Sequence, residues 1–142
     1  MKLINKIGEY VSQPKFRYSH TFDVLRNIFL LRESEKVLVN AVEFTGSNKI
    51  IGDYFEFGIG RGDSFILIGM TMKKLSRKFP LFKETKLYGF DSFEGLPEIK
   101  DIDKQPSWRK GKYKCSKKEI LKKIKSAKID LNKVKLVKGW YD

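Results

Sequence analysis

The sequence is poor in residues that support disulfide, metal or membrane chemistry. Its 142 residues include one cysteine, Cys115, and one histidine, His20, so an internal disulfide is excluded. We found no metal-ligand spacing. No apolar run reaches the about 18 residues of a membrane span, and residues 1–6 lack the continuous apolar stretch of a signal peptide. We therefore expect a cytoplasmic protein with no membrane partner, in which Cys115 is a buried or idle thiol and His20 a surface or capping residue.

Acidic residues are also few, with 17 Asp or Glu against 30 Lys or Arg and a net charge of +13. Residues 109–138 hold thirteen of the basic side chains and only two acidic ones. Such a block can bind nucleic acid, an anionic membrane surface or an acidic glycan. We favour a solvated helix face, because Ser116 and Glu119 form a capping box ahead of one apolar stripe. That stripe consists of Ile120, Leu121, Ile124 and Ala127.

Three of the 11 glycines, Gly58, Gly60 and Gly62, lie close together in the sequence. An apolar strand runs into the pattern Glu-x-Gly-x-Gly-x-Gly from Glu56 to Gly62. Glycines let the chain turn sharply and let backbone N–H groups approach a ligand. The dinucleotide fingerprint G-x-G-x-x-G is not met, because the third glycine comes one residue early and Asp63 stands in its place. NAD is therefore disfavoured. Glu56 instead suits the ammonium group of S-adenosylmethionine (SAM).

A second segment, residues 86–98, predicts a short strand that ends in Asp91, 31 positions after Gly60. In a strand-helix-strand unit this carboxylate reaches the crevice that holds a cofactor ribose. The helix that begins at Gly62 or Asp63 directs free N–H groups and a positive dipole end toward the ligand, which favours the SAM carboxylate. Arg61 adds to that attraction or is simply solvated.

Together these segments resemble the macrocin O-methyltransferase family. The resemblance rests on Glu56–Gly62, on the string Phe-Asp-Ser-Phe-Glu-Gly-Leu-Pro ending at Pro97, and on the closing residues 137–142. It implies a class I SAM-dependent methyltransferase that methylates a hydroxyl on a sugar of a natural product or glycan, with magnesium as a second cofactor. The predicted cofactor-binding residues are Glu56, Gly58, Gly60, Arg61, Gly62, Ser64, Asp91, Ser92, Phe93, Gly139 and Trp140.

Compared with the family pattern, this sequence departs after its third strand. The family's sheet order is three-two-one-four-five-seven-six, so this sequence supplies strands three, two and one. The family's magnesium ligands, general base and acceptor pocket follow the third strand, and no residue here matches them. We expect a fragment that transfers no methyl group alone and self-associates, or binds a partner chain, at the open edge of strand one. Two alternatives are a non-catalytic module with this fold and an RNA-binding or RNA-modifying protein.

The predicted fold is α/β, the N-terminal half of a doubly wound Rossmann-like sheet preceded by helices. We assign residues 1–48 to an N-terminal helical segment and 49–142 to a partial SAM-binding domain, with Gly46–Asn48 as the linker. One or two helices are expected between Thr21 and Phe44, and another from the glycine turn to Pro80. Three layers should result. Trp108 and Tyr113 either cover the cofactor or anchor a polar loop.

Overall fold

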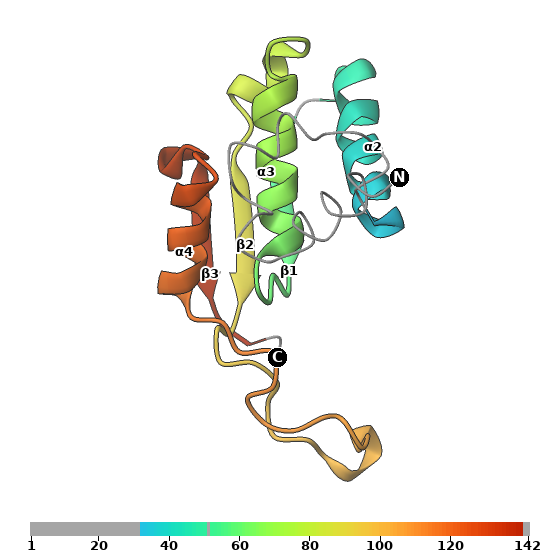
Figure 1. Cartoon of the computed structure of the whole chain (residues 1–142), viewed down its shortest axis with the longest axis vertical. Helices are drawn as coiled ribbons and strands as arrows, with labels where there is room; N and C mark the ends of the chain where they lie inside the picture. The colour runs from blue at the N-terminus through green and yellow to red at the C-terminus, as the bar shows by residue number, and fades with distance from the viewer. Residues whose placement is uncertain (1–31, 51, 141–142) are drawn as a thin grey trace, which may run out of the picture.

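The computed structural model describes residues 32–50 and 52–140 (Figure 1). His20 and residues 21–31 of the helical region predicted between Thr21 and Phe44 lie outside the described residues. The helices are α2 (Glu33–Ser47), α3 (Asp63–Leu75) and α4 (Lys117–Ser126), and the strands are β1 (Tyr54–Phe57), β2 (Leu87–Asp91) and β3 (Val134–Lys138). Short 3₁₀ turns are η3 (Pro80–Lys83), η4 (Asp101–Asp103) and η5 (Leu131–Lys133).

The three described strands form one parallel sheet in the order β1-β2-β3. Tyr54 pairs with Leu87, and Leu87 pairs in turn with Val134. All three strands therefore end at the same edge of the sheet. This order confirms the predicted arrangement of strands three, two and one, with β1 at the edge of the described sheet.

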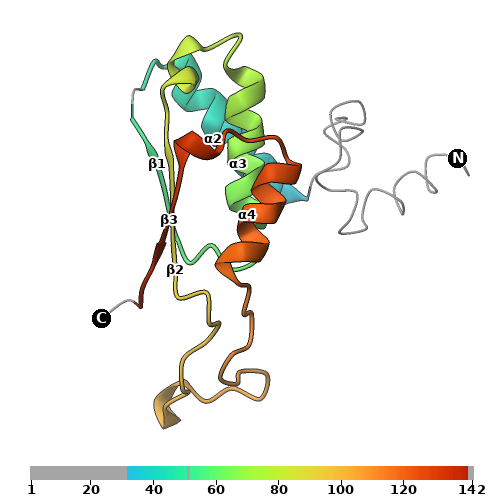
Figure 2. The ribbon, with the colours of Figure 1, turned by 90° about the vertical axis from the view of Figure 1, so that its left-hand side faces the viewer.

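All three described helices lie on one face of the sheet (Figure 2). The inward side chains Leu87 and Leu136 are buried there. Gly89 lies between them, and a Cβ at this position would come within 3.2 Å of Leu136, Phe65 and Ile59. The described part of the chain thus has two layers, whereas three were expected.

The outer face of the sheet carries a layer of aromatic rings. Phe55 stacks on Tyr88 and Phe57 on Phe90, each pair with ring centroids 4.8 Å apart. Phe55 is 53% exposed and Phe57 is 66% exposed. These exposed rings make the outer face unusually apolar for a solvent-facing surface. Parallel sheets are normally covered on both faces.

Two predicted boundaries are wrong. Gly46 and Ser47 form the last turn of α2 rather than a linker, because a glycine at position 46 lets the helix approach the Phe79 ring, only 2.4 Å from where a Cβ would lie. Helix α3 ends at Leu75, four residues before Phe79. Helix α2 packs against α3. The division of the chain at residue 48 stays a prediction.

Helix α4 begins as predicted, with Ser116 and Glu119 forming the capping box. Ile120, Ile124 and Ala127 are buried, but Leu121 is exposed and does not belong to the apolar stripe. Cys115 is buried, and burial raises the pKa of its thiol. The expected inert thiol is therefore confirmed as a buried one.

Residues 96–112, here called the arm, project beyond the sheet between β2 and α4 (Figure 1). Two backbone hydrogen bonds close its base, from Leu96 N to Lys112 O and from Gly111 N to Leu96 O, each 2.9 Å. Trp108 on the arm is 41% exposed, and Tyr113, the first residue after the arm, is 58% exposed.

Candidate cofactor site

The predicted site residues gather where the three strands end. Backbone hydrogen bonds tie the segments that follow the strands, from Gly58 N to Phe90 O (2.8 Å) and from Gly139 N to Asp91 O (3.1 Å). In a parallel α/β sheet, ligands bind in the crevice outside these carboxyl ends. The structure therefore assembles residues 58–64, 91–93 and 139–140 at the expected end of the sheet.

The turn after β1 is left-handed at each of its glycines, with φ of 77° at Gly58, 50° at Gly60 and 79° at Gly62. Residues with a Cβ rarely adopt such angles, so the turn depends on glycine. A Cβ at Gly62 would come within 3.0 Å of the Ile120 side chain, whereas a Cβ at Gly60 would meet no protein atom within 4 Å. The backbone is therefore packed against α4 at Gly62 and open at Gly60.

Asp91 connects β2 to this turn. One carboxylate oxygen accepts a hydrogen bond from Gly60 N (2.8 Å), and the other accepts one from Phe93 N (2.7 Å). Each carboxylate oxygen has a second lone pair that can still accept a hydrogen bond. Asp91 is therefore held in a fixed orientation beside the open part of the turn.

Glu56 lies on the inner side of β1, where two hydroxyl groups hold it. Tyr54 Oη donates to one carboxylate oxygen (2.6 Å), and Ser64 Oγ, in the first turn of α3, donates to the other (2.5 Å). Burial raises the pKa of Tyr54, and the hydrogen bond to Glu56 raises it further. Ser64 was predicted in the site, but Tyr54 was missed because a tyrosine in a strand ordinarily indicates packing.

The side chains of Arg61, Ser92 and Phe93, which were also predicted in the site, make local contacts. Arg61 pairs with Asp63 (3.0 Å). The Ser92 hydroxyl accepts from Glu94 N (3.1 Å) and donates to Gly95 O (3.3 Å), so it shapes the local turn. The Phe93 side chain is buried in the core, and the backbone at this residue has a positive φ of 57°.

Lys123 of α4 contacts the glycine turn, and sequence reasoning missed this contact. Its ammonium group donates to Arg61 O in the glycine turn (2.7 Å) and lies 4.0 Å from Asp63. This link joins residues 62 positions apart. No local pattern distinguishes Lys123 from the other lysines of α4, so only the tertiary structure identifies it.

No three His, Cys, Asp or Glu side chains in residues 32–50 and 52–140 are grouped so that they could hold a metal ion. Within the same residues, no helix combines the length and apolar character needed to cross a bilayer.

Fold and site together define a partial Rossmann-like domain of the methyltransferase type. The macrocin O-methyltransferase (TylF) family matches residues 32–142, and the chain belongs to this family. Family membership implies SAM as the methyl donor. The solved structure of the O-methyltransferase NovP is similar to this chain, with a TM-score of 0.58 and 20% sequence identity. The match covers 75% of this chain and 45% of the NovP chain. No curated protein matches the chain.

Proposed function

We propose that this chain is the SAM-binding part of an O-methyltransferase. The observation that carries the proposal is the hydrogen bond from Gly60 N to Asp91, 2.8 Å long. It places the carboxylate at the end of β2 beside the glycine turn after β1, as the cofactor crevice of a doubly wound sheet requires. The family match supports the same reading.

The residues present fit SAM in three respects. The Asp91 carboxylate retains lone pairs that can accept from the ribose hydroxyls, and Glu56 offers negative charge to the ammonium group. The first turn of α3 offers backbone N–H groups to the carboxylate. When bound, SAM supplies a methyl group on a sulfonium leaving group. This chain's residues contribute orientation, because methyl transfer depends chiefly on placing the methyl carbon against the acceptor oxygen.

We further propose a hydroxyl on a sugar of a natural product or glycan as the acceptor, with magnesium assisting. Both proposals rest on the family alone. A general base and metal ligands are not assigned to any described residue, so the binding of SAM is the part of the function that this chain's residues support directly.

Calorimetry on the 142-residue chain tests the cofactor. We expect SAM and its demethylated product S-adenosylhomocysteine to bind with one-to-one stoichiometry, because both carry the ribose, ammonium and carboxylate groups. NAD should not bind. NAD binding as tight as that of SAM, or no binding of either adenosyl ligand, would contradict the assignment.

Substituting Lys123 with methionine should weaken SAM binding about fivefold, since the partly buried ammonium contributes roughly 1 kcal/mol through its hydrogen bond to the turn. Lys122→Met is the matched control, because it removes the same charge from the neighbouring, exposed position of α4. An equal loss in both variants would indicate a general charge effect and not the contact with Arg61.

We also propose that the aromatic outer face of the sheet, next to the open edge of β1, mediates self-association. Replacing both Phe55 and Phe57 with serine should lower the average mass measured by light scattering, because these rings supply the exposed apolar area. Ile102→Ser removes an even more exposed side chain, 92% exposed, from the arm and should leave the mass unchanged. A wild-type chain that is monomeric at all concentrations would refute this proposal.

A further inference from the structure

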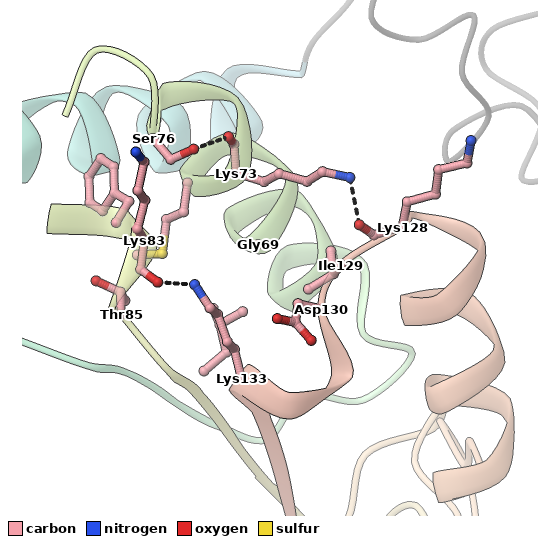
Figure 3. A pocket seen from close by; sticks show the side chains of 12 residues that line it. Gly69, Lys73, Ser76, Lys83, Thr85, Lys128, Ile129, Asp130 and Lys133 are labelled. Atoms are coloured by element: carbon pink, nitrogen blue, oxygen red, sulfur yellow. Dashed lines mark hydrogen bonds between the residues drawn. The ribbon is translucent and has the colours of Figure 1, made fainter. Parts of the chain in front are cut away.

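A cavity of about 170 Å³ lies at the other end of the domain (Figure 3). Its walls come from the C-terminal half of α3, from η3 and the start of β2, and from the segment between α4 and β3. The glycine turn precedes α3, whereas Lys73 and Ser76 of the cavity lie at the end of that helix. A helix of 13 residues is about 20 Å long, so the cavity is separate from the cofactor site.

The floor of the cavity is apolar. It includes the buried side chains of Phe82, Leu87 and Ile129, together with Met72. Ile129 packs directly against Gly69, because a Cβ at position 69 would come within 2.8 Å of the Ile129 side chain. The floor therefore suits an apolar group and offers little to a fully hydrated ion.

The rim is strongly basic. Lys73, Lys83, Lys128 and Lys133 line it with one carboxylate, Asp130. Lys73 Nζ donates to Lys128 O (2.6 Å), and Lys133 Nζ donates to Lys83 O, so two of the ammonium groups are held across the walls (Figure 3). Each ammonium has three donors and uses one in these contacts.

Asp130 offsets only part of this charge. Its carboxylate accepts from Asn132 N (3.0 Å) and caps η5. The Lys128 side chain points away from the cavity (Figure 3), so three ammonium groups, those of Lys73, Lys83 and Lys133, stand against one carboxylate. This charge favours an anion at the rim, while burying that anion against the apolar floor is costly. The two halves of the cavity thus suit two parts of one ligand.

We propose that this cavity binds a small organic anion with an apolar body, of the aromatic carboxylate class. The ring would lie on Phe82, Leu87 and Ile129, with the carboxylate between the rim lysines. The size agrees, since an engineered cavity of about 150 Å³ accommodates benzene. This site does not depend on the proposed SAM binding.

Benzoate is the probe. Two further ligands each lack one of its two features, the ring or the charge. Acetate keeps the charge without the ring, and benzyl alcohol keeps the ring without the charge. The Met72 methyl resonance of the full chain is followed by NMR at constant ionic strength. We expect saturable shifts with benzoate and a Kd about tenfold lower than for either partial probe.

The double variant Lys83→Gln, Lys133→Gln should weaken benzoate binding about fivefold. The control Lys118→Gln, Lys122→Gln removes the same charge from the exposed face of α4 and should change it less than about twofold. The proposal is overturned if benzoate produces no saturable shift, if acetate binds as tightly, or if both double variants lose affinity equally.

Discussion

Replacing Asp91 with alanine is expected to weaken SAM binding roughly 10- to 100-fold. A hydrogen bond to a charged group contributes about 1.5–3 kcal/mol, and each 1.4 kcal/mol corresponds to about tenfold in Kd. The substitution removes the proposed ribose acceptor. It also removes the acceptor for Gly60 N and Phe93 N, so the turn itself loses its link to β2. Calorimetry with SAM measures the loss.

Asp53 provides a matched control for Asp91. Its carboxylate accepts from Lys86 N (2.9 Å) and likewise links the chain around β1 to the chain around β2, but at the opposite end of the strands. Asp53→Ala should therefore lower the melting temperature without changing the affinity for SAM. If the two alanine variants lose the same affinity, Asp91 acts on stability alone and the ribose assignment fails.

Replacing Gly60 with valine is expected to abolish measurable SAM binding. A Cβ at this position meets no protein atom within 4 Å, so a branched side chain would occupy the space that we assign to the ligand. Because φ is 50°, the variant also carries backbone strain of about 1–2 kcal/mol. A melting temperature lower by several degrees should accompany the loss.

Gly111→Val separates the two effects. Gly111 has a positive φ of 75°, and the nearest atom to its Cβ position is Glu94 O at 3.9 Å. This variant carries similar strain in the arm, away from the glycine turn, and should bind SAM normally. Normal binding by Gly60→Val would show that the turn serves packing only.

The glycine turn, the start of α4 and the end of β2 follow from local sequence. The glycine spacing specifies a left-handed turn because only glycine adopts positive φ repeatedly without strain. The pair Ser116 and Glu119 specifies the start of α4, since both partners lie within one helical turn. Strand β2 ends at Asp91 as predicted. These are short-range properties, and the parallel order of the strands follows from the helices between them.

Contacts between distant residues had no counterpart in the local pattern. The end of α2 depends on how closely Gly46 approaches Phe79, and the sequence alone suggested a linker there. Only the folded chain shows that Tyr54 contacts Glu56 and that Lys123 contacts Arg61.

The sequence by itself determined the glycine turn after β1, the acidic residues beside it and the membership of a methyltransferase family, because these depend on residue type and spacing along the chain. Tertiary structure alone decided that the described helices share one face of the sheet, and that lysines from three segments line one cavity. Such features depend on which side chains come into contact when the chain folds. A lysine's sequence neighbours do not indicate whether its ammonium group will reach solvent, a carbonyl or the edge of a cavity.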